Sequence, residues 1–283
     1  MTRPRSTTSS RTRLARQRSR LPSGPRTRGV ALVTGAARGI GAATVRRLSA
    51  EGWNVIAVDR AEDDPRLPYG MGTVAELQAL ANERVVAIPA DVCDAEALGG
   101  AVEIAERRWG GLDVIVAAAG VIAGGVPAWE LDVEQGRAVL EVNLGGVLTA
   151  ARVGIPALLR KPEPREGRFI AVGSTAATRG LPMLAAYCAA KAGVTGLIRA
   201  LAVELAGTGV TANAVSPGST RTAILDESAR LYGLESAEAF AVQQPLGRLI
   251  EPEEVAALIA WLASVQSAGA TGGDYPLDGG LAL

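Results

Sequence analysis

Residues 29–41 read GVALVTGAARGIG, an apolar run that leads into a turn containing Gly35, Gly39 and Gly41. The apolar run has the composition of a buried strand, and residues 40–50 have that of a helix. Glycine lets a chain turn sharply and approach a phosphate closely. A helix that begins at such a turn directs free N–H groups at an anion. The stretch therefore predicts a strand, turn and helix that bind a pyrophosphate; the alternative is a tight turn without a ligand.

The alternation of short apolar runs and helical patterns continues along the chain. We expect further strands at 54–58, 84–89, 112–118, 168–173, 211–215 and 275–277. We expect helices at 40–50, 95–109, 133–159, 187–205 and 253–263. Strands that alternate with helices form βαβ units, whose right-handed crossovers place helices on both faces of a parallel sheet. The predicted fold is α/β: one Rossmann-type, doubly wound parallel sheet domain over residues 29–283.

The composition restricts the chemistry. The 283 residues are 48% hydrophobic and 4% aromatic, which favours an aliphatic core of helices packed on a parallel sheet. No apolar run reaches the roughly 18 residues of a membrane span. Cys93 and Cys188 are the only cysteines, which fits a reducing cytoplasm rather than a disulfide scaffold. The absence of histidine excludes Ser–His and Cys–His dyads and His-ligated zinc, so we expect no metal site.

The charge is distributed unevenly. Residues 1–28 hold nine arginines and no acidic residue. The rest of the chain holds the other 20 basic residues and all 29 acidic ones, a net charge of −9, which disfavours a nucleic-acid partner. We interpret residues 1–28 as a disordered basic extension, because they are rich in Ser, Thr and Pro. A nucleic-acid or organelle-targeting arm and a start codon placed too early are the alternatives.

Asp59 indicates which nucleotide is bound. It ends the second predicted strand 24 residues after Gly35, near the ~20-residue offset at which a carboxylate receives ribose hydroxyls. A carboxylate there would repel a 2′-phosphate, so NAD is favoured over NADP. Arg38 and Arg60 are a counter-signal, because a nearby arginine can pair with that phosphate. An ordinary turn residue is the alternative reading of Asp59.

Tyr187 and Lys191 are four residues apart on a predicted helix, and Ser174 precedes Tyr187 by 13 residues. Residues four apart share one helix face. The pKa of a free tyrosine is about 10, and a close ammonium group favours the phenolate and lowers that pKa. Ser174 would hold the substrate oxygen beside the tyrosine. An isolated Tyr-x-x-x-Lys pair usually lies on a solvated face, but the preceding Ser and the glycine-rich turn favour catalysis here.

With these motifs the chain resembles the short-chain dehydrogenase/reductase family over residues 29–283. Thr34–Gly41 is similar to the family's TGxxxGxG turn, and 217–222 is similar to its PGxxxT segment. The resemblance implies a catalytic set of Asn143, Ser174, Tyr187 and Lys191. It implies that NAD is contacted by Gly35, Arg38, Gly39, Ile40, Gly41, Asp59, Arg60, Asp91, Val92, Ala119, Gly120, Tyr187, Lys191, Pro217, Gly218, Thr220 and Thr222.

The resemblance further implies an activity and an assembly. Hydride would pass between nicotinamide and a secondary alcohol or ketone, and the protein would be a homotetramer. The backbone carbonyl of Asn143 would bind a water that links Lys191 to solvent. Ala118 departs from the family's asparagine at that position, which removes a side-chain hydrogen bond that braces the central strand.

Residues 61–72, here called the strap, contain two prolines and two glycines and are predicted to form a loop. Thr73 then opens a helix, with Glu76 completing a capping box. The strap, 217–222 and 231–234 resemble mycofactocin-associated short-chain dehydrogenases. In that group such an insertion covers NAD, which stays bound between turnovers, and mycofactocin, a peptide-derived redox cofactor, accepts the electrons. The strap looks shorter than in many of that group, and an ordinary surface loop is the alternative.

Residues 223–244, here called the lid, mix apolar and acidic side chains and are predicted to be mobile. Apolar faces on a lid suit a small apolar alcohol or carbonyl substrate, and no cluster of arginines indicates an acidic one. Simple amphipathic packing is the alternative. Two further functions stay open: a conventional dehydrogenase with exchangeable NAD(P), and a non-catalytic binding or regulatory protein on the same fold. The intact Asn–Ser–Tyr–Lys set argues against the second.

Overall fold

The computed structural model describes residues 28–283, so all but the last residue of the predicted basic extension lies outside the described part. Seven parallel strands form one sheet in the order β3-β2-β1-β4-β5-β6-β7. The strands are β1 (Val30–Thr34), β2 (Asn54–Asp59), β3 (Val85–Pro89), β4 (Val114–Ala117), β5 (Gly167–Val172), β6 (Val210–Pro217) and β7 (Asp274–Leu277). The strand order reverses between β1 and β4, where doubly wound sheets bind ligands. The predicted α/β fold is confirmed.

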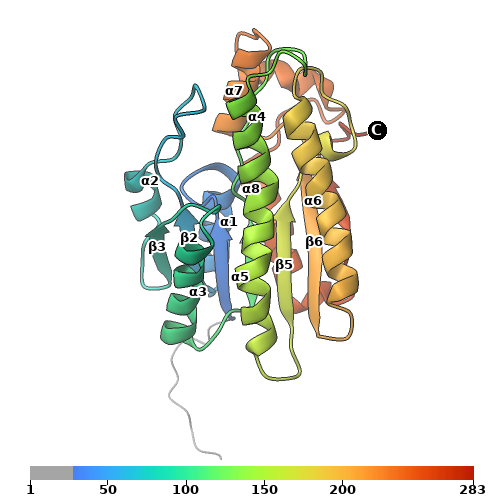
Figure 1. Cartoon of the computed structure of the whole chain (residues 1–283). Coiled ribbons are helices and arrows are strands. Elements are labelled where there is room, and N and C mark those ends of the chain that lie inside the picture. The colour runs from blue at the N-terminus through green and yellow to red at the C-terminus, as the bar shows by residue number, and fades with distance from the viewer. Residues whose placement is uncertain (1–27) are drawn as a thin grey trace, which may run out of the picture.

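Helices cover both faces of the sheet (Figure 1). One face carries α3 (Ala95–Trp109), α4 (Val133–Leu140), α5 (Gly146–Arg160) and α6 (Ala185–Glu204). The other carries α1 (Gly39–Ala50) and α8 (Pro252–Ala263), with the short α2 (Val74–Gln78) beside β3. The capping box predicted at Thr73 and Glu76 is present at the start of α2.

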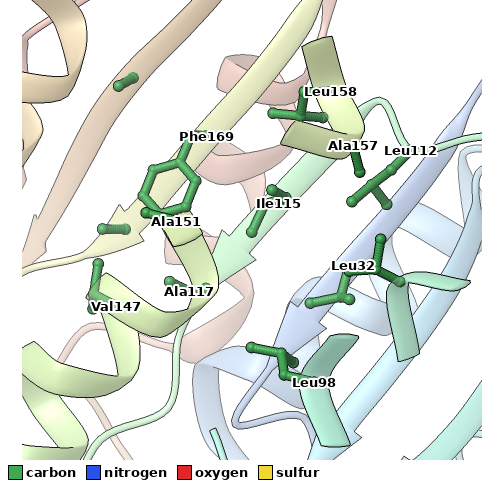
Figure 2. Close-up of a cluster of buried hydrophobic side chains, with 14 of the residues drawn as sticks. Leu32, Leu98, Leu112, Ile115, Ala117, Val147, Ala151, Ala157, Leu158 and Phe169 are labelled. Carbon is green, nitrogen blue, oxygen red and sulfur yellow. The ribbon is translucent and has the colours of Figure 1, made fainter. Parts of the chain in front are cut away.

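The larger of the two core layers lies under α3 and α5, and Figure 2 shows part of it. Leu98 of α3 and Val147 of α5 point toward Leu32, Ile115 and Phe169 of three neighbouring strands. All five side chains are at most 3% exposed. Alternate strand residues point to the opposite face and form the second layer, as the two-residue repeat of a strand requires.

Two helical stretches have the length and composition of a membrane span. Val133–Arg160 and Ala185–Glu204 have mean hydropathies of 1.5 and 1.3. Both belong to the helix layer that packs against β4, β5 and β6. A Cβ built on Gly154 of α5 would lie 2.2 Å from Cδ1 of Ile115, so this helix rests directly on the sheet. The apolar faces are therefore used in the core of the domain.

The prediction of one long helix over 133–159 is confirmed, since the helical stretch runs from Val133 to Arg160 without a break, but its middle has a different helical geometry. A π-helical turn, Glu141–Gly145, separates α4 from α5. Such a turn inserts an extra residue into the helical register and occurs frequently at functional positions. The insertion turns Asn143 inward, where it is completely buried. The pattern of apolar residues does not reveal this shift, because helical periodicity continues on both sides of it.

The carboxyl ends of the strands lie toward the top of Figure 1, together with α7 and the C-terminus. The strap follows β2, and the lid forms α7 (Ala223–Leu231) and the 3₁₀ segment η3 (Ala237–Gln243). The strap and the lid, here called the two covers, therefore lie at the carboxyl ends of the strands, where a doubly wound fold places its ligand.

Candidate active site

A cavity of about 630 Å³ opens at the carboxyl ends of the strands, within the usual range for a cofactor site. Three of the four predicted catalytic residues line it: Ser174, Tyr187 and Lys191. All predicted cofactor contacts line it as well: Gly35, Arg38, Gly39, Ile40, Gly41, Asp59, Arg60, Asp91, Val92, Ala119, Gly120, Tyr187, Lys191, Pro217, Gly218, Thr220 and Thr222. Segments that are distant in sequence thus surround one space.

The glycine-rich turn forms a hollow that any side chain at the glycine positions would fill. Gly35 has φ +65°, and a Cβ on it would lie 2.6 Å from Cα of Ala119. A Cβ on Gly41 would lie 1.9 Å from the carbonyl oxygen of Gly35. Arg38, the N-cap residue of α1, makes no side-chain cap, and the first turn holds no acidic residue. The positive end of α1 is therefore directed at a negative ligand, which fits the pyrophosphate of NAD.

Asp59 and Arg60 end β2 beside this turn. The carboxylate of Asp59 accepts hydrogen bonds from the N–H groups of Ala37 (3.0 Å) and Ala61 (2.9 Å). A carboxylate has lone pairs for further donors, so ribose hydroxyls fit the same group. Arg60 faces Asp64 at 3.1 Å and Asp91 at 3.8 Å. Of the two arginines that could have favoured a 2′-phosphate, Arg60 is thus already paired with carboxylates, which supports the preference for NAD.

The strap is attached to the glycine-rich turn at its C-terminal end. The guanidinium of Arg38 donates to the carbonyl of Gly70 at 2.9 Å. A Cβ on Gly72 would lie 2.6 Å from Cβ of Ala37 and 3.5 Å from Oδ1 of Asp59. The strap therefore returns directly over the phosphate and ribose side of the cavity.

The middle of the strap reaches the opposite wall. Leu67 is 7% exposed and packs in a cluster with residues that follow β4 and with α4 and α6. The hydroxyl of Tyr69 accepts a hydrogen bond from the N–H of Ile122 at 2.9 Å. Arg66 pairs with Glu141 of the π turn at 2.5 Å. Burial raises the pKa of Tyr69 to about 12, so this hydroxyl is neutral at physiological pH.

A buried carboxylate stabilises the strap from within. Asp64 is 3% exposed and pairs with both Arg60 and Arg66, the latter at 2.8 Å. The hydrogen bond from Arg66 is the main reason that the pKa of Asp64 falls to about 2. The sequence did not single out Asp64, Arg66 or Tyr69; the contacts of Arg66 with Glu141 and of Tyr69 with Ile122 join residues that are distant in sequence.

Ser174 and Tyr187 meet beside the cavity. Ser174 follows β5 and caps the 3₁₀ turn Thr175–Ala177, its hydroxyl accepting from the N–H of Ala176 at 3.1 Å. Tyr187 lies in the first turns of α6. Burial raises the pKa of Tyr187, and the hydrogen-bonding Ser174 hydroxyl acts in the opposite direction. The pKa of Tyr187 is therefore raised, not lowered as expected from Lys191, because desolvation is the larger effect.

Lys191 lies one helical turn beyond Tyr187 and is 4% exposed. Its ammonium donates to the carbonyl of Val172 at 2.9 Å and lies 5.7 Å from the centre of the Tyr187 ring. Burial lowers the pKa of Lys191 to about 8. The lysine can therefore change its protonation state near physiological pH, which a solvated lysine cannot do.

Asn143 lies behind the cavity rather than in its wall. Its amide donates to the carbonyl of Val121 (2.8 Å) and accepts from the N–H of the same residue (2.9 Å). A Cβ on Gly120 would lie 3.0 Å from the Asn143 side-chain oxygen and 3.8 Å from Nζ of Lys191. The Asn143 side chain thus braces the segment after β4 beside the catalytic lysine.

Thr34 compensates for the missing asparagine at position 118. Its hydroxyl oxygen accepts hydrogen bonds from the N–H groups of Ala118 (3.1 Å) and Ala119 (3.3 Å). The end of β4 is therefore braced from β1 instead of by a side chain of its own.

The substrate end of the cavity has mostly apolar walls. The lid supplies Ile224, Leu225, Tyr232, Leu234 and Phe240. Two residues that the sequence reasoning missed complete this end: Arg179, in the loop after Ser174, and Leu281, near the end of the chain. Within residues 28–283 no group of three His, Cys, Asp or Glu side chains is arranged to hold a metal ion.

A doubly wound sheet with this cavity and a Ser–Tyr–Lys set defines a class, the nicotinamide-dependent oxidoreductases. Residues 35–282 match a family model described as enoyl-(acyl carrier protein) reductase. The chain is 38% identical over 253 residues to cis-4-hydroxycyclohexanecarboxylate dehydrogenase of Sinomonas cyclohexanicum, covering 89% of this chain and 95% of that protein. The chain belongs to the short-chain dehydrogenase/reductase family, as its motifs predicted, and is an NAD-dependent enzyme.

Solved structures agree with this assignment. Carveol dehydrogenase from Mycobacterium avium in complex with NAD superposes with a TM-score of 0.85 at 32% identity, covering 90% of this chain and 98% of that one. 3-Ketoacyl-(acyl-carrier-protein) reductase from Brucella melitensis complexed with NADH gives 0.80 at 29% identity, covering 91% and 99%.

Proposed function

We propose that the protein is a dehydrogenase of secondary cyclic alcohols, with Tyr187 as its acid–base residue. The observation that carries the proposal is that Ser174, Tyr187 and Lys191 face the same cavity as the glycine-rich turn. The named substrate of the Sinomonas relative is a cyclic alcohol, which supports this choice. The mainly apolar lid supports a substrate with an apolar body.

In this reaction the side chains of the site transfer one proton from the alcohol toward solvent. Bound NAD would supply the carbon that accepts hydride from the alcohol, and the positive charge of its oxidised ring would favour the phenolate of Tyr187. The phenolate of Tyr187 takes the hydroxyl proton as the carbonyl forms, and Ser174 holds the substrate oxygen. Lys191, with a pKa lowered to about 8 by burial, passes the proton onward. The backbone carbonyl of Asn143 binds the water that connects Lys191 to solvent. Reduction of a ketone reverses each step.

The proposal includes NAD that stays bound between turnovers, with mycofactocin as the electron acceptor. The strap contacts support it: Arg38 with Gly70 on the phosphate side, and Tyr69 with Ile122 on the opposite wall. The buried Leu67 and the Arg66–Glu141 pair add an apolar and an ionic attachment. NAD could leave only after these contacts break, because the strap spans the cavity between its two attachments.

Nucleotide content tests this proposal directly. We would purify the protein without added cofactor, denature it, and measure nicotinamide nucleotide in the supernatant. Near one NAD per chain is the expected result, and alcohol oxidation should then require an artificial electron acceptor rather than free NAD. An empty protein that reduces added NAD with cyclic alcohols would contradict retention and leave a conventional dehydrogenase. If NAD is retained, reduction of purified mycofactocin by the enzyme and an alcohol would test the electron acceptor itself.

We further propose a homotetramer in the cytoplasm. Exposed apolar side chains support association through two faces: Leu148 of α5 and Val203 of α6 are 48% and 77% exposed, and Trp261 of α8 and Val265 are 40% and 62% exposed. The cysteines of the described residues are free, which fits a reducing compartment. Light scattering should give four times the chain mass; a monomer at micromolar concentration would contradict this assembly.

A further inference from the structure

Arg179 is set apart from the other charged residues of the cavity. Arg38, Asp59, Arg60, Glu62, Asp64 and Asp91 line the cofactor end. Lys191 lies at the catalytic centre, under Tyr187. Among the lining residues of the described chain, Arg179 alone places a charge at the substrate end. An isolated cation at an otherwise uncharged end of the cavity indicates what that end receives.

The structure holds Arg179 in place and leaves most of its donors free. Its N–H donates to the carbonyl of Thr175 at 2.9 Å, which fixes the loop directly after Ser174. Its guanidinium donates to the carbonyl of Leu281. Within residues 28–283 no carboxylate forms an ion pair with it, whereas Arg60 has two such partners. A guanidinium has five N–H donors, so a second acceptor can bind.

The surroundings of Arg179 have room for that acceptor and do not supply it. A Cβ built on the neighbouring Gly180 would meet nothing within 4 Å. Leu181, Leu184, Leu234 and Leu281 line the same end and offer no anion. Arg179 and Gly180 are exposed, so water solvates the free donors of the guanidinium until an anionic ligand replaces that water.

We propose that Arg179 binds a carboxylate of the substrate while Tyr187 receives its hydroxyl group. The substrate is then a hydroxy acid with an apolar ring between the two groups, and this inference rests on the proposed function. A planar guanidinium fits a carboxylate through two parallel hydrogen bonds. A phosphate dianion would require a second cation, and none lies at this end among the described residues.

The contact with Leu281 extends the site to the end of the chain. The side chain of Leu281 is 6% exposed and lines the cavity, while its carbonyl orients Arg179. The final residues therefore shape the substrate end. This contact also supplies the competing explanation, that Arg179 serves only to anchor the C-terminal segment.

The test compares 4-hydroxycyclohexanecarboxylate, cis and trans, with the corresponding amides, which keep the shape and remove the charge. The holoenzyme is assayed with an artificial electron acceptor. In Arg179→Gln the ratio of kcat/KM for the acid to that for the amide should fall roughly 10- to 100-fold, mostly through KM. Arg179→Lys should recover part of the lost preference for the acid. Arg107→Gln, on α3 and away from the cavity, is the matched control and should keep the wild-type ratio.

Binding provides a readout that does not depend on turnover. We would titrate cyclohexanecarboxylate and its amide into the holoenzyme by calorimetry. The Arg179→Gln change should weaken the binding of the acid and leave the binding of the amide unchanged. Equal losses for acid and amide would overturn the inference in favour of the anchoring role. A wild-type enzyme that oxidises neutral cyclic alcohols and does not prefer the acid would overturn it too. Failure to oxidise any alcohol, with selective binding of the acid retained, would instead reject the proposed function.

Discussion

Two covers lie over the same cavity, and they are attached differently. The strap has no core of its own: Leu67 packs into a cluster with Val121, Val139 and Ala190 of the body. The lid packs largely on itself, through Leu225, Ala229, Ala237 and Phe240. Lifting the strap exposes part of the body's core, whereas the lid can move as a unit with its own core intact. The difference suits a cofactor that stays and a substrate that exchanges.

Polar contacts join both covers to the body, since the lid residues Glu238 and Gln244 bind Arg221 and the N–H of Ser219. The strap is connected to the body by the Arg66–Glu141 pair and by the hydrogen bonds at Gly70 and Tyr69. In the lid, Glu227 is buried but pairs with Arg230 of the same helix. The hydroxyl of Tyr232 donates to the carbonyl of Pro182 at 2.7 Å and joins the lid to the loop between Ser174 and α6. Changes at the catalytic centre, the cofactor end and the substrate end should therefore be separable.

Tyr187→Phe should have the largest effect. It removes the proton acceptor while keeping the ring, so kcat should fall by roughly 10²- to 10⁴-fold. Nucleotide content should stay at the wild-type level, because the strap is untouched. Steady-state assays and nucleotide analysis of the same preparation check both statements. Retention of a tenth of the wild-type kcat would remove Tyr187 from its assigned role.

The pH profile should depend on Lys191. Burial lowers its pKa to about 8, so below that pH the lysine holds its proton and cannot accept another. Alcohol oxidation should therefore rise as pH increases through about 8, with an apparent value that belongs to the Tyr187–Lys191 pair. In Lys191→Met the rise should move to higher pH, because burial raises the pKa of Tyr187. An unchanged profile in this variant would exclude the lysine from the proton path.

Asp59→Ser should affect only the cofactor end. Without the carboxylate, the discrimination against NADP should decrease by roughly 10- to 100-fold, as expected when a charged hydrogen-bond acceptor is lost. The affinities of apoprotein for NAD and NADP, measured by fluorescence titration, check this. The KM for the alcohol should change little, since Asp59 lies at the other end of the cavity. A variant that still rejects NADP would assign the selectivity to another residue.

Leu67→Ala should loosen the strap by removing its apolar attachment. Leucine truncation costs about 2 kcal/mol or more in a buried site, so release of bound NAD should accelerate roughly 30-fold or more. Val74→Ala, just beyond the strap at a position that is 50% exposed, is the matched control. NAD release is followed by trapping the free nucleotide with an excess of a second dehydrogenase. Equal release rates in both variants would show that the strap does not retain NAD.

Local patterns in the sequence predicted the strands, the glycine-rich turn and the Tyr187–Lys191 pair, since each depends on residues close together in the chain. The strap ion pair between Arg66 and Glu141 joins residues 75 apart, and the Arg179–Leu281 contact joins residues 102 apart. Such contacts depend on how the elements pack, which one sequence does not specify. The π turn escaped prediction for a different reason: a one-residue insertion leaves the apolar periodicity on either side intact.

A matched pair of substitutions should give the smallest effects and the sharpest comparison. Tyr69 and Tyr232 each connect a cover to the body through one hydroxyl hydrogen bond. Each Tyr→Phe change removes one such bond, worth about 1 kcal/mol, or roughly fivefold in an equilibrium constant. Tyr69→Phe should accelerate NAD release without changing the KM for the alcohol. Tyr232→Phe should raise that KM and leave NAD release unchanged. If both variants altered both quantities, the strap and the lid would move together, and the separation of the two ends would be wrong.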